Sequence, residues 1–287
     1  MTAQIIDGKA IATRVQAETQ QRAAEFETRF GRKVGLEVVL VGDDQASHVY
    51  VRNKERTSQA LGMHSLAHRL PADSSQAKVV ELVRQLNADP NVDAILVQLP
   101  LPKHIDASAV IDEIDPSKDV DGLTAVSAGL LALGRPMLQP CTPVGCIRLL
   151  DEVGCDPSGK HALVIGRSNL VGKPVAQMLL TRNATVTMAH SRSRDLAALV
   201  AQADIVVAAA GRRDLVRGEW IKPGAVVLDV GTNRNDAGKL CGDVEFAVAK
   251  ERASFITPVP GGVGPMTIAM LLGNAVRAAF ARAGAGS

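Results

Sequence analysis

Aromatic side chains are scarce in this chain of 287 residues, where Phe, Trp and Tyr together make up 2% and tyrosine occurs once, at Tyr50. The core must therefore be built from Val, Leu, Ile and Ala, which is typical of parallel α/β layers whose strands are buried on both faces. An excess of one charge is also lacking, because 32 basic and 30 acidic residues leave a net charge of +2. That balance argues against a general nucleic-acid or membrane-surface binder.

Long apolar runs, a signal-peptide pattern and metal motifs are missing as well. No run reaches the length that spans a bilayer, so we expect no membrane segment. The six histidines do not cluster with the cysteines, whose spacing matches no zinc pattern, so we expect no metal. Free thiols in a reducing cytoplasm are the simplest account of Cys141, Cys146, Cys155 and Cys241.

Strand and helix patterns alternate through the first 122 residues, which predicts a parallel sheet covered by helices. We interpret Ser47 as the N-cap of the second helix and Gly62 as its stop. The predicted strands are 36–41, a weaker 63–70, and 94–99; the predicted helices are 8–30, 47–61, one from Ser74 or Ser75 to about 86, and 105–114.

A second strand–helix series begins after Pro140 and has the element order of a dinucleotide-binding α/β domain. The predicted strands are 160–165, 184–189, 204–208 and 225–230. The predicted helices are one from Pro143 to about 153, one that follows the 166–174 loop and ends at about 182, one through 196–200, and one from Met266 to about 281.

The loop after the first of these strands, Gly166–Gly172, is a candidate phosphate site, because it would place backbone N–H groups and a helix N-terminus at an anion. It departs from G-x-G-x-x-G, since Ser168 stands at the second glycine, and a bland turn could have the same sequence. The next strand ends in His190-Ser-Arg-Ser-Arg194, where an NAD site usually has an acid. Arginines there can pair with a 2′-phosphate, which predicts NADP, unless they only form a solvated helix start.

Tyr50 and Lys54 lie four residues apart in a predicted helix and so point the same way. A phenol beside an amine is a general acid/base pair in outline. A solvated lysine one turn from a half-buried tyrosine would give the same pattern.

Three further stretches could contact a ligand. Gln98 ends a buried strand, where it would present an amide or simply be a satisfied polar strand end. Asp119 and Asp121 lie in a turn, where a carboxylate can accept N–H bonds from a ligand or form an Asx-turn. The Pro260-Gly-Gly-Val263 loop would permit close backbone approach, although a plain loop is the alternative.

Together these stretches resemble the bifunctional methylenetetrahydrofolate dehydrogenase / methenyltetrahydrofolate cyclohydrolase family, from about Ile6 to Arg282. Thr232 departs from the family, which usually has Ile there beside the cofactor. The matching motifs are Ser47 with Tyr50-Val-x-x-Lys54, Val97-Gln-Leu-Pro-Leu-Pro102, Lys118-Asp-Val-Asp-Gly122, Pro140-Cys-Thr-Pro143, Gly166-Arg-Ser with Val171-Gly-x-Pro174, and Pro258-Val-Pro-Gly-Gly-Val-Gly-Pro-Met-Thr267.

The resemblance implies two α/β domains with a cleft between them. Residues 1–122 would form a folate-binding catalytic domain, and residues 140–265 a Rossmann-like NADP-binding domain. The C-terminal helix, 266–287, would pack back onto the first domain. The resemblance also implies tetrahydrofolate derivatives as substrates and a homodimer formed through the cofactor domain.

The resemblance assigns roles to individual residues as well. Hydride transfer needs mainly geometry, whereas hydrolysis needs proton transfer, so Lys54 is expected to be the general acid/base, with Tyr50 and Gln98 beside it. Asp121, rather than Asp119, is expected to anchor the pterin. The implied substrate-binding residues are Tyr50, Lys54, Val97, Gln98, Leu99, Asp121, Pro260, Gly261, Gly262 and Val263; the implied cofactor-binding residues are Gly166, Arg167, Ser168, Val171, Gly172, Ser191, Arg192 and Thr232.

Three rival functions remain: an NADP dehydrogenase of another small molecule, such as a shikimate-type enzyme; a non-catalytic NADP-binding regulator; and a dehydrogenase without the hydrolytic step. The Asp121 turn and the Pro260–Val263 loop argue against the first. The regulator would have no use for Tyr50, Lys54 and Gln98 together.

Overall fold

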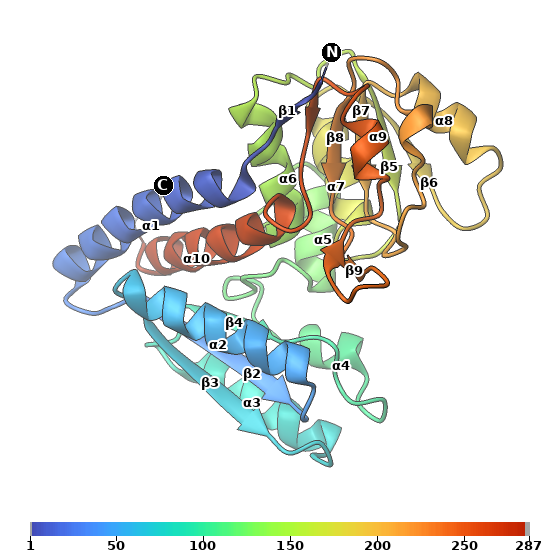
Figure 1. The fold of residues 1–287 in the computed structure, drawn as a ribbon. Coiled ribbons are helices and arrows are strands. Elements are labelled where there is room, and N and C mark those ends of the chain that lie inside the picture. The colour runs from blue at the N-terminus through green and yellow to red at the C-terminus, as the bar shows by residue number, and fades with distance from the viewer. Residues whose placement is uncertain (1, 285–287) are drawn as a thin grey trace. The chain divides into compact units, whose positions relative to one another are not determined.

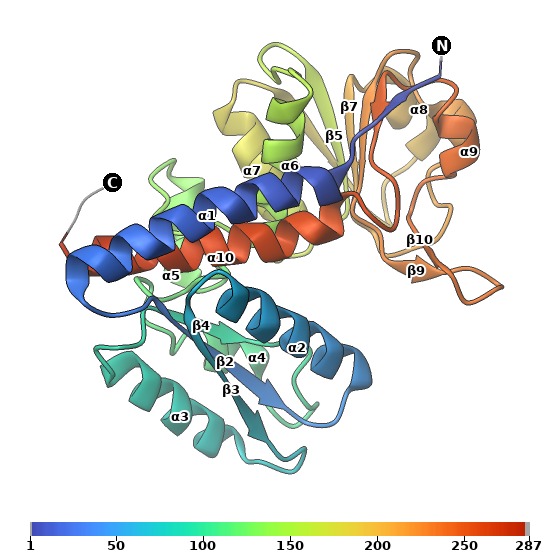
Figure 2. The ribbon, with the colours of Figure 1, turned by 60° about the vertical axis from the view of Figure 1, so that its left-hand side comes forward.

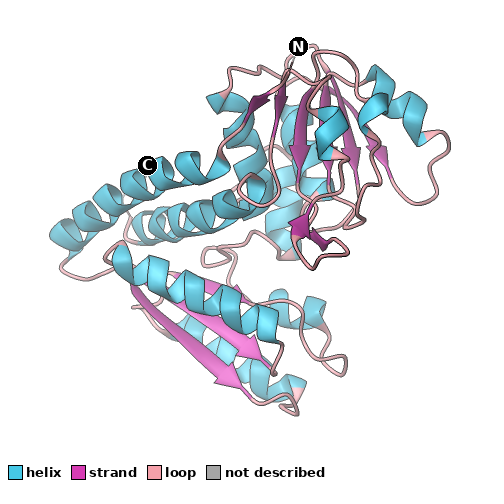
Figure 3. Ribbon diagram, in the orientation of Figure 1, coloured by secondary structure: helices cyan, strands magenta, loops and turns pink. Residues whose placement is uncertain are grey.

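The computed structural model describes residues 2–284 and divides into two compact units (Figure 1). The three-stranded unit comprises residues 14–141 and 268 onward, and the six-stranded unit comprises residues up to 13 and 142–267. Each unit has its own parallel sheet covered by helices (Figure 3), which confirms the predicted α/β class.

The sheet of the three-stranded unit has the order β3-β2-β4. Side chains of β2 alternate between two cores: Val38 and Leu40 pack with residues of α1 and α10, while Val39 and Val41 pack with residues of α3 and α4. Within this unit α1 and α10 run side by side (Figure 2). The elements are α1 (Gly8–Phe30), β2 (Gly35–Val41), α2 (Gln45–Ala60), β3 (His64–Leu70), α3 (Gln76–Ala88), β4 (Ala94–Val97), α4 (Ala107–Ile111), α5 (Ala125–Ala132) and α10 (Val263–Arg282).

The sheet of the six-stranded unit has the order β1-β11-β8-β7-β5-β6. The chain passes from β5 to β6 on one side and then crosses to β7 on the other, so the topological switch point lies at β5. The elements are β1 (Gln4–Ile5), α6 (Cys141–Glu152), β5 (His161–Ile165), α7 (Gly172–Thr181), β6 (Thr185–Ala189), α8 (Leu196–Gln202), β7 (Ile205–Ala208), a 3-10 turn (Gly218–Trp220), β8 (Val226–Asp229), the hairpin of β9 (Asn233–Arg234) and β10 (Leu240–Cys241), α9 (Phe246–Ala249) and β11 (Phe255–Ile256).

The start of α2 differs from the prediction. Asp44, not Ser47, is the N-cap, and its side chain accepts hydrogen bonds from the Ser47 N–H at 2.8 Å and hydroxyl at 2.7 Å. A carboxylate at this position also complements the helix dipole. Gly62 ends the helix as predicted, with φ at +83°.

Three further differences from the prediction concern segments that are too short, or too uniformly apolar, to show a helix or strand periodicity. The apolar helix α5 and the β9–β10 hairpin have no predicted counterpart. Helix α10 begins at Val263 rather than Met266. Strand β1 pairs in parallel with β11, so the first 13 residues belong to the six-stranded unit and not with the rest of residues 1–122.

Helix α10 is long and apolar enough to cross a membrane by length and composition, with a mean hydropathy of 1.3, although no apolar run was expected to reach that length. In this structure 61% of that apolar window is buried. Leu271, Leu272, Val276 and Phe280 belong to the core of the three-stranded unit. A core helix therefore accounts for its composition.

Candidate functional site

Lys54 is a buried amine on α2, with 9% of its surface exposed. Its Nζ donates a hydrogen bond to Gln98 Oε1 at 3.0 Å. Burial lowers the pKa of Lys54, and the nearby charge of Asp121 opposes that shift. An ammonium held in this way can release its proton more easily than a solvated lysine, as a general base requires.

Gln98 follows β4 directly and is fixed at both ends of its amide. Its Nε2 donates to the Leu99 carbonyl at 2.7 Å, so its Oε1 is turned to Lys54. Its backbone N–H donates to the Val39 carbonyl at 2.8 Å, which extends the pairing of β4 with β2. Val97 is buried in the core, and Leu99 is half-buried. The strand thus aims the amide of Gln98, while Val97 packs inside the unit.

The two aspartates of the turn after α4 have different environments. Asp119 is buried and accepts hydrogen bonds from the N–H groups of Leu123 at 3.1 Å and Thr124 at 2.8 Å, so it holds the turn. Asp121 is half-buried, burial raises its pKa, and the charge of Lys54 opposes that shift. The structure therefore gives Asp119 a structural task and leaves Asp121 beside Lys54.

Tyr50 lies one turn before Lys54 on α2, and 49% of its surface is exposed. A phenol with this exposure can contact a bound ring while the amine behind it stays dry. The structure thus brings Lys54, Gln98 and Asp121 together in the three-stranded unit, with Tyr50 one turn from Lys54 on α2.

The Pro260–Val263 loop lies in the six-stranded unit. The loop packs closely on the start of α1: a Cβ at Gly8 would lie 1.8 Å from the Gly262 carbonyl oxygen, and the Lys9 N–H donates to the Gly261 carbonyl at 3.1 Å. A Cβ at Gly262 itself would lie 2.6 Å from the Pro258 carbonyl oxygen. Pro260 is exposed, Gly261 has φ at +105°, and Val263 is buried as the first residue of α10.

The loop between β5 and α7 is built for close backbone packing. A Cβ at Gly166, whose φ is +125°, would lie 2.1 Å from the Ala209 carbonyl oxygen, and one at Gly172 would lie 2.3 Å from the Gly166 carbonyl oxygen. Ser168 Oγ accepts from the N–H groups of Val171 at 3.1 Å and Gly172 at 3.3 Å. Ser168 therefore holds the turn before α7, whose N-cap residue is Val171, and the side chains of Arg167 and Ser168 are exposed at this edge of the sheet.

The basic stretch after β6 lies beside that loop, because Ile165 pairs with Ala189 and the Gly166 N–H donates to the Ala189 carbonyl at 2.8 Å. Ser191 and Arg192 are exposed. The acid that follows, Asp195, caps α8 by accepting from the Ala198 N–H at 3.1 Å. Arg192 is thus exposed next to the Gly166–Gly172 loop, and the carboxylate of Asp195 is occupied in capping α8. This arrangement fits the binding of a 2′-phosphate.

Two buried aspartates that the sequence did not single out fix the other loops at this edge. Asp243 accepts from the N–H groups of Ala210, Gly211 and Arg212 at 2.6 to 2.9 Å. Asp229, at the end of β8, accepts from the N–H groups of Gly231, Asp243 and Val244 at 2.9 to 3.0 Å. Burial raises the pKa of Asp229 to about 7, while these N–H donors oppose that shift.

Thr232 follows Asp229 by three residues and is exposed, so its side chain is presented at this edge. The sequence did not single out Asp243, because the N–H groups from which its carboxylate accepts lie more than 30 residues earlier in the chain.

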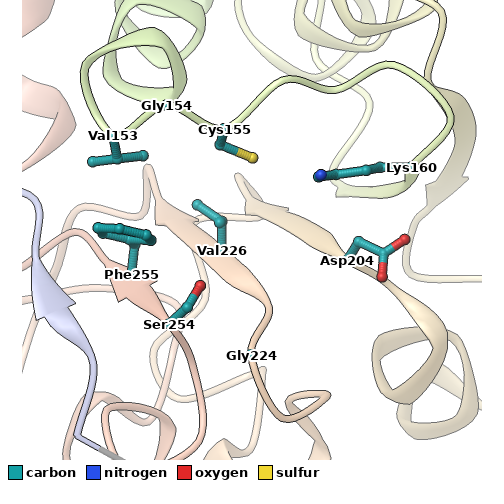
Figure 4. Close-up of a pocket in the computed structure, with 9 residues that line it drawn as sticks. All are labelled: Val153, Gly154, Cys155, Lys160, Asp204, Gly224, Val226, Ser254 and Phe255. Carbon is teal, nitrogen blue, oxygen red and sulfur yellow. The ribbon is translucent and has the colours of Figure 1, made fainter.

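A pocket of about 410 Å³ lies at the other end of the strands (Figure 4). Its lining includes Lys160 before β5, Asp204 before β7 and Val226 at the start of β8, whereas the predicted cofactor residues follow the strands. In Figure 4 the amine of Lys160 and the thiol of Cys155 point toward one another. This pocket is separate from the candidate cofactor site. No group of three or more His, Cys, Asp or Glu residues within 2–284 could hold a metal ion.

Comparison with known proteins identifies the family. The model of the tetrahydrofolate dehydrogenase/cyclohydrolase catalytic domain matches residues 6–121, and that of the NAD(P)-binding domain matches residues 140–283. The chain is 58% identical over 283 residues to the bifunctional protein FolD of Sorangium cellulosum (strain So ce56), covering 98% of this chain and 99% of that protein.

Solved structures agree. The bifunctional FolD enzyme from Campylobacter jejuni has a TM-score of 0.96 at 43% identity, covering 98% of this chain and 99% of the other. The Trypanosoma brucei methylenetetrahydrofolate dehydrogenase-cyclohydrolase, complexed with NADP cofactor and inhibitor, has a TM-score of 0.93 at 42% identity, covering 97% and 98%. The chain belongs to the tetrahydrofolate dehydrogenase/cyclohydrolase family.

Proposed function

We propose that this protein oxidises 5,10-methylenetetrahydrofolate to 5,10-methenyltetrahydrofolate with NADP and then hydrolyses the product to 10-formyltetrahydrofolate. The observation that carries the proposal is the buried Lys54 amine in a chain of this family. This amine is hydrogen-bonded to Gln98, and its pKa is lowered by burial while the charge of Asp121 opposes that shift. Bound NADP supplies the hydride acceptor for the first step. The two family matches together argue against a shikimate-type enzyme.

Proton transfer in the hydrolytic step falls to Lys54. A water molecule forms a C–O bond to the methenyl carbon, one C–N bond of that carbon breaks, and the departing nitrogen takes one of the water's two protons. The other proton is released, because the cationic methenyl compound becomes a neutral formyl product. Lys54 accepts a proton from the water and returns one to that nitrogen, and the burial that lowers its pKa makes its ammonium form easier to deprotonate. Gln98 holds the amine in position through its Oε1, and Tyr50 packs beside the reacting ring.

Asp121 holds the pterin. Its carboxylate can accept two N–H bonds from the 2-amino-4-oxo edge of the ring, an arrangement that charge strengthens. The remaining substrate contacts are assigned to Val97, Leu99 and the Pro260–Val263 loop. Because the side chain of Val97 is buried in the core, its contribution is assigned to its backbone.

Cofactor binding is assigned to the loops that follow β5, β6 and β8. The Gly166–Gly172 loop would lie against the phosphates, Ser191 and Arg192 would pair with the 2′-phosphate, and Thr232 would lie at the cofactor's ribose or adenine side. The exposure of Arg167, Ser191 and Arg192 at one edge of the sheet supports this assignment.

We also assign the protein to the cytoplasm and to a homodimer formed through the six-stranded unit. Strand β6 is an edge of that sheet, and Met188 on it and Leu180 on α7 are 37% and 63% exposed. An apolar edge of this kind is normally covered. Light scattering should give twice the mass of the chain for the native protein, and Met188→Lys should reduce it; a monomeric native protein would remove the assignment.

The decisive experiment is a coupled assay with 5,10-methylenetetrahydrofolate and NADP⁺ that follows both methenyl- and formyl-tetrahydrofolate. Formation of both supports the proposal. Accumulation of the methenyl compound alone would leave a dehydrogenase without the hydrolytic step, and no turnover would leave a binding protein.

A further inference from the structure

Asn274 is a buried amide on α10, with 5% of its surface exposed. Its Nδ2 donates to the Val120 carbonyl at 2.9 Å and to the Gln139 carbonyl at 2.8 Å, and lies 3.6 Å from Cys141 Sγ. Because carbonyl oxygens only accept, the amide must present its NH₂ group here. A single side chain thus joins α10 to two segments that are distant in sequence.

Both segments border Asp121. Val120 precedes it, and the Val120 carbonyl also accepts a hydrogen bond from Cys141 Sγ at 3.3 Å. Burial raises the pKa of Cys141 well above its ordinary value, so the thiol keeps the proton that it donates. On the other side, a Cβ at Gly122 would lie 2.8 Å from the Gln139 carbonyl carbon, so the backbone after Asp121 packs directly on the segment that Asn274 holds.

We infer that Asn274 is a positioning residue for substrate binding, which fixes the Asp121 carboxylate through the backbone on both of its sides. The inference rests on the proposed role of Asp121 as the pterin anchor. Two N–H bonds to a flat ring edge need a carboxylate of fixed orientation, and a backbone free to rotate at Val120 would lose that orientation. Asn274 therefore contributes to folate affinity without touching the folate.

The test compares Asn274→Ala with Thr19→Val by steady-state kinetics. Thr19 is an equally buried polar residue of the same unit, and its hydroxyl donates within α1, to the Val15 carbonyl at 2.8 Å. Asn274→Ala should raise KM for methylenetetrahydrofolate about tenfold, the effect of losing a well-made buried hydrogen bond, with KM for NADP⁺ unchanged. Thr19→Val should lower the melting temperature and leave both KM values unchanged.

A double-mutant cycle separates positioning from general loss of stability. If Asn274 acts only through Asp121, the Asn274→Ala/Asp121→Ala protein should have the folate KM of Asp121→Ala alone. Asn274→Asp should move the acidic limb of the pH profile of kcat/KM for folate to higher pH, because a second carboxylate raises the pKa of Asp121, whereas Asn274→Ala should not.

An unchanged folate KM in Asn274→Ala, or additive effects in the double variant, would overturn the inference. Should Asn274→Ala not fold, Asn274→Ser keeps one donor and is measured in the same cycle. Failure of the Asp121 assignment has a different signature: Asp121→Ala would leave the folate KM unchanged, whatever the effect of Asn274→Ala.

Discussion

Replacing Lys54 by Gln should separate the two activities of this enzyme. The amide of Gln keeps a hydrogen-bonding end that can reach Gln98 Oε1, which now accepts from the Lys54 amine at 3.0 Å. It cannot exchange a proton near neutral pH. The substitution therefore keeps the geometry on which hydride transfer depends and removes the proton carrier on which hydrolysis depends.

The expected magnitudes follow from these two effects. General acid/base catalysis contributes about 10²–10⁴-fold, so cyclohydrolase turnover should fall by that order. A weakened hydrogen bond to Gln98 costs about 0.5–1.5 kcal/mol, so dehydrogenase turnover should fall by about tenfold at most. Methenyltetrahydrofolate should then accumulate in the coupled assay.

Lys54→Met is the matched variant, because it keeps the length of the side chain and loses the hydrogen bond as well. It should lower dehydrogenase turnover below that of Lys54→Gln while leaving the hydrolytic loss similar. The reasoning is refuted if Lys54→Gln lowers both activities equally in a folded protein that still binds NADP. Lys54 would then position the folate, and the proton carrier would have to be sought at Tyr50, Asp121 or a bound water.

Three other results are expected. Asp121→Ala should raise KM for folate about 5- to 150-fold in both activities, from about 1–3 kcal/mol for unpaired N–H donors, and leave NADP binding by calorimetry intact; loss of NADP affinity instead would contradict the assignment. Arg192→Asp should raise KM for NADP more than for NAD, and equal changes would exclude a 2′-phosphate contact there. Burial lowers the pKa of Lys54 below its unfolded value, so the unfolded chain binds more protons between the two pKa values. The free energy of unfolding should therefore rise with pH in that window. Chemical denaturation of Lys54→Met at a series of pH values should lack this rise, and an unchanged slope would contradict the reasoning.

Much of the fold could be predicted because its strands are short apolar runs between turn residues. Residues 36–41 and 94–99 were expected as strands, and β2 and β4 occupy Gly35–Val41 and Ala94–Val97. Helix α5 could not be predicted in this way, since Ala125–Ala132 is apolar on every side and has no 3.6-residue pattern. The N-cap was misassigned because Asp44 and Ser47 both suit it, and only the hydrogen-bond geometry decides between them.

Local chemistry in the candidate site can be read from the sequence, and contacts between distant segments cannot. The spacing of Tyr50 and Lys54 places them on one helix face, and the strand end places Gln98. The turn residues alone left Asp119 and Asp121 equivalent, the family resemblance selected Asp121, and the N–H groups from which Asp119 accepts explain the structural task of Asp119. Asn274 reaches Val120 across 154 residues of sequence, and no pattern within one segment could reveal that contact.

The chain passes between the two units three times, near residues 13, 141 and 267, and this limits how the enzyme can be dissected. A fragment cut after residue 122 would carry β1 without its partner β11 and would lack α10, with its core side chains and Asn274. The complementary fragment would lose the edge strand of its sheet and expose the apolar face of α10. Simple truncation is therefore unsuited to isolating either activity.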